Sequence, residues 1–142
     1  MNLAHANIVS ILVAAVAAWI FGGIYYTSLT KYWVAAQGKT VEQCKAEQAA
    51  KSGLGKGAPF VVVFVSEIII GWVLYGILLH MNAFSVRAGM ISAAFCWFGF
   101  VLTTIATNNA FGNRRVMLTV IDSVAWFGAF LIIGAIVGGF GP

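Results

Sequence analysis

The sequence predicts an all-α integral membrane protein, a single domain over residues 1–142. Of the 142 residues, 61% are hydrophobic and only 8% are charged, whereas a soluble domain is nearer half apolar and a quarter charged. The apolar residues gather in four segments, about 8–29, 59–80, 88–107 and 116–140. Each is long enough to cross a hydrocarbon core of ~30 Å, which takes about 20 helical residues. The segments are continuously apolar rather than alternating, so they indicate a four-helix bundle and not a membrane barrel.

The first segment is interpreted as a retained span rather than a cleaved signal peptide. No Lys or Arg occurs in residues 1–7, and the apolar run is longer than a typical signal-peptide core. Ala14, Ala18 and Gly22 recur at four-residue spacing along it. Such a stripe of small residues lets a second helix approach closely, either within the chain or in another subunit.

The loop of residues 30–58 is the only substantial polar region. Within it, Thr40-Val41-Glu42-Gln43 fits a capping box and Gly53 fits a helix stop, so a short helix is expected over residues 41–52. We expect this helix to rest on the cytoplasmic surface of the membrane. A flexible link then leads to Pro59, which suits the first turn of the second span.

The third and fourth spans follow closely on the second. The connection between the second and third spans is short, and Arg87 is its basic residue. The fourth span contains Gly134 and Gly138, a GxxxG pattern that is typical of close helix packing in lipid. This second stripe is also expected to pack either within the chain or between subunits.

The basic residues predict how the spans are oriented. All five lysines lie in the first connection, and Arg114 and Arg115 lie in the third. Basic residues in short loops stay in the cytoplasm, so both termini are expected outside, an N-out/C-out topology. The net charge of +4 is then a topology signal with affinity for anionic lipid headgroups. It indicates no nucleic-acid partner, because no basic patch interleaved with aromatic residues is present.

Two carboxylates, Glu67 and Asp122, fall inside predicted spans. An acid at the centre of a span is costly, so it usually has a partner or a function. Counted at 1.5 Å per residue, Glu67 lies roughly 12 Å from Pro59, and Asp122 lies roughly 10 Å from Arg115. Both distances run inward from the cytoplasmic boundary, so the two acids are expected at the same depth.

Other polar side chains are expected to reach this layer. Thr104 and Asn108 share a face of the third span, Tyr26 comes from the first span, and Arg115 is placed to neutralise Asp122. Such groups form either an intramembrane binding site or hydrogen bonds that fix which helix faces meet. For Asp122 the two interpretations stay balanced. For Glu67, with no basic residue near it in sequence, function is favoured.

The sequence shows no catalytic, metal or cofactor motif. Cys44 and Cys96 belong to different environments and lack the spacing of metal ligands. No HExxH motif, P-loop or dinucleotide fingerprint is present. We therefore expect no cofactor and no metal, and the sequence argues against an enzyme.

Several motifs carry a resemblance to a known family. They are Asn7-Ile8, Gly22-Gly23-Ile24-Tyr25-Tyr26-Thr27-Ser28, Lys31-Tyr32-Trp33, Trp97-Phe98-Gly99-Phe100, Asn109-Ala110-Phe111-Gly112-Asn113-Arg114-Arg115 and Ile121-Asp122. On these motifs the chain resembles the prokaryotic membrane proteins catalogued as domain of unknown function 1761. It departs from them in having Tyr25 where a tryptophan is frequent, and Ser123-Val124 after the acid. The resemblance implies a four-span fold in the cytoplasmic membrane of a prokaryote, and no known activity.

Two functions are consistent with this pattern. The first is the binding or transport of a small solute or ion by a homo-oligomer, with Glu67 as the proton or cation site. The alternative is an accessory or scaffold subunit of a larger membrane complex, docked through the small-residue stripes. A membrane enzyme acting on lipids ranks third, because no nucleophile is recognisable.

Overall fold

The computed structural model describes residues 7–142, and within that range the chain is helical and contains no strand. Four helical runs are long and apolar enough to cross a membrane. They are α1 (Ile8–Ser28), α4 (Gly53–Met81), the run of α5 (Val86–Cys96), η2 (Trp97–Leu102) and α6 (Thr103–Phe111), and α7 (Val116–Phe140). The all-α prediction and the four candidate spans are thereby confirmed.

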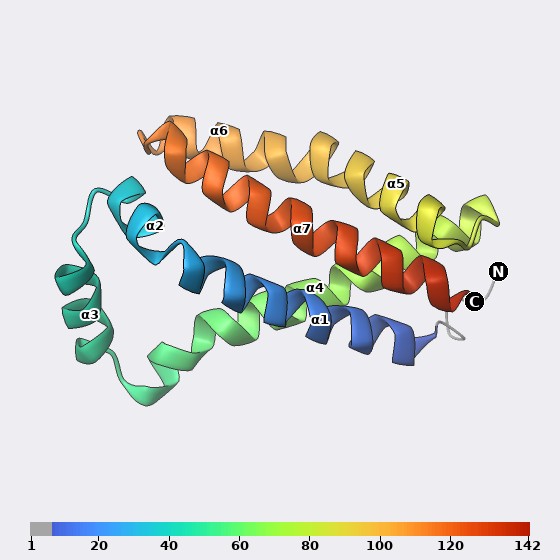
Figure 1. Cartoon of the computed structure of the whole chain (residues 1–142), viewed down its shortest axis with the longest axis horizontal. Helices are drawn as coiled ribbons and strands as arrows, with labels where there is room; N and C mark the ends of the chain where they lie inside the picture. The colour runs from blue at the N-terminus through green and yellow to red at the C-terminus, as the bar shows by residue number, and fades with distance from the viewer. Residues whose placement is uncertain (1–6) are drawn as a thin grey trace.

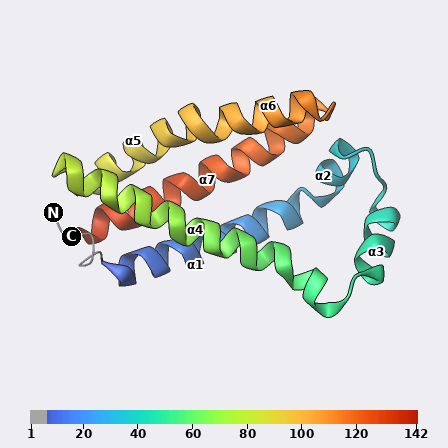
Figure 2. The ribbon, with the colours of Figure 1, turned by 180° about the vertical axis from the view of Figure 1, so that it is seen from behind.

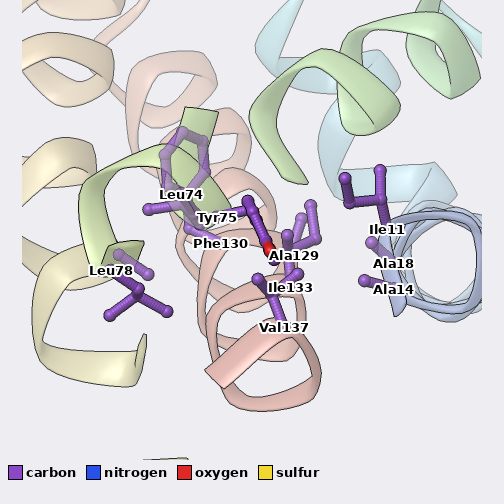
Figure 3. Close-up of a cluster of buried hydrophobic side chains, with 11 residues drawn as sticks. Ile11, Ala14, Ala18, Leu74, Tyr75, Leu78, Ala129, Phe130, Ile133 and Val137 are labelled. Carbon is purple, nitrogen blue, oxygen red and sulfur yellow. The ribbon is translucent and has the colours of Figure 1, made fainter. Parts of the chain in front are cut away.

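Helix α7 is the centre of the bundle. It lies between α1 and the α5–α6 run, and α4 packs across the pair of α1 and α7 (Figures 1 and 2). The core is formed where α1, α4 and α7 meet, and it includes Ile11, Leu74 and Ile133 (Figure 3). Toward the α3 end, α4 diverges from α7 and α6, and its first eleven residues, 53–63, are all exposed.

The small-residue stripes pack within the chain. Ala14 and Ala18 of α1 are fully buried in the core. Helices α5 and α7 approach so closely that a Cβ added at Gly89 would overlap the backbone carbonyl of Gly134, and one added at Gly138 would overlap the carbonyl of Ser85. Close backbone approach of this kind is what small residues permit in a membrane helix pair.

Gly22 is the exception among the predicted packing residues. A Cβ built on it would meet no atom within 4 Å, so no packing requirement within the chain explains a glycine there. The other four predicted packing residues are occupied by contacts inside the bundle. A docking surface for another protein therefore cannot use them without opening the bundle.

The polar loop is more helical than the sequence predicts. Helix α3 (Val41–Ala50) has the expected capping box: Thr40 Oγ1 accepts from the Gln43 backbone N–H at 3.2 Å, and the Thr40 N–H donates to Gln43 Oε1 at 2.8 Å. Before it lies an unpredicted helix, α2 (Thr30–Ala36), which begins directly after α1. Its presence brings Trp33 back against the bundle.

The second span begins earlier than the position of Pro59 suggests. Helix α4 starts at Gly53, where the side chain of Ser52 accepts a hydrogen bond from the Gly55 backbone N–H at 3.4 Å. Pro59 therefore lies in the second turn rather than the first, and the expected flexible link over residues 53–57 is helical. The serine cap outweighs the glycines, because it satisfies a free backbone donor of the first turn.

The third span changes its helical type in the middle. Residues 97–102 form a π-helical segment, η2, between α5 and α6. A π segment places one extra residue in the helix and rotates the following side chains around the axis. The face that α6 turns toward α7 therefore cannot be obtained by continuing the α-helical period from α5.

Candidate functional site

Asp122 anchors three helices at the end of the bundle that carries α2. Its Oδ1 atom accepts a hydrogen bond from the Tyr26 hydroxyl at 2.9 Å and another from Trp33 Nε1 at 3.1 Å. Tyr26 belongs to α1, Trp33 to α2 and Asp122 to α7. Two donors on one oxygen atom hold the carboxylate in a fixed position, so Asp122 ties α2 to the start of α7.

Aromatic packing supports this anchor. The rings of Tyr26 and Trp33 meet edge to face with their centroids 5.5 Å apart, an arrangement that aromatic pairs prefer. The neighbouring Tyr25 donates its hydroxyl hydrogen to the Ile121 carbonyl at 3.0 Å. The chain can fold back in this way because α1 ends at Leu29, whose φ of −104° and ψ of 14° depart from helical values.

Arg115 does not neutralise Asp122. Its Nη1 atom donates instead to the backbone carbonyl of Ala35, at 2.6 Å. Ala35 lies in the last turn of α2, where its carbonyl also accepts from the Gly38 backbone N–H at 3.0 Å and where a cation is favourable. Arg115 therefore ties the connection between α6 and α7 to the end of α2.

Glu67 has a very different environment. It lies on α4 with only 2% of its surface exposed, and its Oε2 atom has no hydrogen-bond partner among residues 7–142. One turn further along α4, a Cβ at Gly71 would lie 3.2 Å from Ile11 Cγ2 and 3.5 Å from Ile133 Cγ2. Glu67 is thus enclosed where α4 packs on apolar residues of α1 and α7.

The two acids are not at the same level of the bundle. Helices α4 and α7 run in the same direction (Figure 1), and Gly71 lies beside Ile133. Glu67, one turn before Gly71, is therefore level with about residue 129 of α7. Asp122 lies seven residues closer to the start of α7, which is roughly 10 Å.

The earlier start of α4 explains this offset. The depth expected for Glu67 was counted from Pro59, but α4 begins at Gly53. Six additional residues correspond to about 9 Å along a helix, which is nearly the whole difference. Glu67 therefore lies near the middle of α4, and Asp122 lies near the α2 end of the bundle.

The predicted polar residues of the third span do not join either acid. Thr104 and Asn108 are exposed on α6, and no hydrogen bond links their side chains to another residue in the described range. The neighbouring Asn109 is the one that faces α7, where its Nδ2 atom donates to Thr119 Oγ1 at 3.0 Å.

Trp33 is the functional neighbour that sequence reasoning missed. It lies in the predicted polar loop of residues 30–58. The signal that could have found it is its spacing, because Tyr26 and Trp33 are seven residues apart and face the same side of a helix that continues. The structure interrupts that helix only at Leu29.

The best-defined hollows of the surface are apolar and exclude both acids. One of about 380 Å³ lies along α4 and is lined by Trp72, Val73, Gly76, Ile77, His80 and Met81. Another, of about 220 Å³, lies between α4, η2 and α7. In the part of the chain that the structure describes, no group of three or more His, Cys, Asp or Glu residues is arranged to hold a metal ion. Glu67 and Asp122 therefore lie apart from each other and outside both hollows.

Comparison with known proteins gives one match. A family model described as a protein of unknown function (DUF1761) matches residues 9–138, nearly the whole chain. No curated protein and no solved structure matches the chain significantly.

Proposed function

Since the chain belongs to the DUF1761 family of proteins of unknown function, we propose from its structure that it is a membrane protein that binds a proton or small cation at Glu67. In this proposal the protein carries that ion within the membrane and works as a homo-oligomer. The burial of Glu67 without a hydrogen-bond partner for Oε2 is the observation that carries the proposal.

The energetic argument starts from the cost of an isolated charge. An ionised carboxylate in a dry, apolar site is unfavourable by several kcal/mol unless a partner compensates it. One turn along α4, the backbone at Gly71 meets the apolar side chains of Ile11 and Ile133, and no donor among residues 7–142 reaches Glu67 Oε2. A proton or small cation supplies the missing compensation, and its departure restores the cost. Glu67 therefore binds such an ion reversibly, whereas a carboxylate held only for structure would have hydrogen-bond donors.

Asp122 has those donors, and we assign it a structural role. Its oxygen Oδ1 is held by Tyr26 and Trp33, and the same region contains the contact between Arg115 and Ala35. Together these bonds keep the first and third connections at one end of the bundle. The proposed orientation puts this end in the cytoplasm, because six of the eight basic residues lie in these two connections and a seventh, Lys56, lies in the first turn of α4. The membrane is then the cytoplasmic membrane of a prokaryote.

The proposal of a homo-oligomer is based on the hollows that a single chain contains. The two hollows along α4 are apolar and do not reach Glu67, which supports a path for the ion that is formed by surfaces of more than one copy. The alternative is an accessory subunit of a larger membrane complex. The many exposed apolar side chains on α1 and α4 favour it, because they fit a membrane partner as well as lipid.

The test labels the buried carboxyl group chemically. Dicyclohexylcarbodiimide partitions into lipid and reacts with protonated carboxyl groups there. Protein in liposomes is expected to gain one adduct by intact mass spectrometry, and Glu67→Gln is expected to gain none. Glu47→Gln, which removes an exposed acid of α3, is the matched control and keeps the adduct.

Ion movement is measured on the same liposomes. With a pH-sensitive dye inside and an imposed membrane potential, wild-type protein is expected to shift the internal pH, while Glu67→Gln stays at the rate of empty liposomes. If the wild-type protein gains no adduct at any pH, and Glu67→Gln leaves every flux and bound ion unchanged, the proposal is refuted.

A further inference from the structure

We propose that the outer face of α6 is the surface through which two copies of this chain associate, with Thr104, Thr107 and Asn108 of one copy against the same residues of the other. This outer face is defined as these three residues together with Phe111. The inference deepens the proposed function, since it names the interface of the proposed homo-oligomer. It requires no ion at Glu67, so it can be tested independently.

Helix α6 lies at the edge of the bundle. It runs beside the first half of α7, and the views from both sides show no helix outside it (Figures 1 and 2). The side that faces α7 is fixed by the hydrogen bond from Asn109 to Thr119. The opposite side is free, and all four residues of the outer face are exposed.

The polar residues of the outer face form one continuous stripe. Thr104, Thr107, Asn108 and Phe111 are spaced at i, i+3, i+4 and i+7, which places them on the same side of a helix. No hydrogen bond links the side chain of Thr104, Thr107 or Asn108 to another residue within the range 7–142. By contrast, the nearby Thr103 bonds to the carbonyl groups of Gly99 and Phe100. The stripe thus presents unused donors and acceptors.

Thr104 and Thr107 lie within the predicted third span of residues 88–107, and Asn108 directly follows it, inside the apolar helical run Val86–Phe111. Asn109 bonds to Thr119, the fourth residue of α7, and is therefore about one turn from the start of that helix. Thr104 is five residues further in, so it lies roughly 12 Å from the same boundary. Lipid tails offer no hydrogen bonds there, and a polar group without a partner is unfavourable in hydrocarbon.

A second copy supplies the missing partners. A carboxamide contains both donor and acceptor atoms, so two copies of Asn108 satisfy one another across a two-fold axis along the membrane normal. Polar side chains at such contacts stabilise helix association in membranes. Phe111, 90% exposed, lies at the end of the polar stripe and supplies apolar contact area beside it. Self-complementarity favours a second copy over an unrelated partner.

Cysteine crosslinking in native membranes tests this interface. In a background carrying Cys44→Ser and Cys96→Ser, Thr104→Cys and Asn108→Cys are expected to form disulfide-linked dimers on mild oxidation. Ile20→Cys is the matched control, since Ile20 is exposed on α1 and lies eight residues, about 12 Å, from the end of its helix. It is expected to remain monomeric.

A second measurement quantifies the contribution of the amide. Energy transfer between labelled copies is measured as the protein is diluted with added lipid. Asn108→Leu is expected to raise the dimer dissociation constant about 3- to 30-fold. Asn108→Gln keeps the amide and most of the affinity. Asn109→Leu removes a bond inside the chain, so it lowers thermal stability and leaves the dimer intact.

Each outcome decides the proposal. Crosslinks confined to the stripe, together with a weaker dimer for Asn108→Leu, support it. A protein that stays monomeric at every dilution overturns it, and so does a dimer that crosslinks through Ile20→Cys or binds equally well without the amide. If the wild-type protein forms this dimer but gains no carbodiimide adduct, and Glu67→Gln leaves the ion flux unchanged, ion binding at Glu67 is refuted and the interface is still supported.

Discussion

Replacing Glu67 of α4 and Asp122 of α7 is expected to change stability in opposite directions. Glu67→Met keeps the length and approximate volume of the side chain but removes a buried carboxyl group that lacks a partner for Oε2. Asp122→Ala removes the acceptor of two hydrogen bonds. The two variants therefore distinguish a carboxylate that is proposed to bind an ion, Glu67, from a carboxylate that stabilises the fold, Asp122.

The structure sets the size of both effects. A buried polar group without a partner costs about 1–3 kcal/mol, so Glu67→Met is expected to raise the free energy of unfolding by about this amount. A hydrogen bond contributes a net ~0.5–1.5 kcal/mol. The loss of the bonds from Tyr26 and Trp33 is then expected to lower the free energy of unfolding by about 1–3 kcal/mol in Asp122→Ala.

The assay is reversible unfolding in mixed micelles, followed by tryptophan fluorescence as the fraction of denaturing detergent increases. Glu67→Met should unfold at a higher fraction than wild type and should lose the carbodiimide adduct. Asp122→Ala should unfold at a lower fraction. A stability loss in Glu67→Met equal to that in Asp122→Ala would refute the reasoning, because Glu67 would then have a structural partner.

Three further changes test the packing and the polar contacts. Gly89→Ala is expected to lower the free energy of unfolding by about 1–3 kcal/mol, because the added Cβ meets the backbone of α7. Gly23→Ala is the control, since a Cβ there meets no atom within 4 Å. In the same unfolding assay it is expected to be neutral or up to about 1 kcal/mol more stable. Trp33→Phe keeps a ring but removes a donor to Asp122, so it is expected to cost about 0.5–1.5 kcal/mol and to speed proteolysis within α2. Glu47→Gln breaks an exposed ion pair with Lys39 and is expected to change the thermal midpoint little, within about 0.5 kcal/mol.

The sequence predicts the helices well because their cause is local. A run of about 20 apolar residues has to be helical in lipid, and such a run is visible without knowledge of its neighbours. The capping box at Thr40 is equally local, since its donor and acceptor lie three residues apart. Gly134 and Gly138 predict a close contact with another helix, but the identity of that helix depends on the arrangement of the whole bundle.

The contacts of the polar residues could not be predicted in the same way. Asp122 is reached by Trp33 only because α1 ends at Leu29 and α2 turns back toward α7. Arg115 is two turns from Asp122 in sequence, yet it donates to the carbonyl of Ala35 at the end of α2. The π segment rotates α6, so that Asn109 rather than Asn108 faces α7.

The depth of Glu67 shows how one helix boundary controls a functional inference. When α4 is assumed to begin at Pro59, both acids fall in one layer and a shared site follows naturally. With the observed start at Gly53, Glu67 moves about 9 Å deeper and leaves the reach of Tyr26 and Asp122. At that level α1 presents the buried Ala14 and Ala18, and Gly71 lets α4 sit close to Ile11. The small residues that allow this tight packing carry no side-chain donors, so the packing that stabilises the bundle also isolates the carboxyl group. Within residues 7–142 no side chain therefore donates a hydrogen bond to Glu67 Oε2.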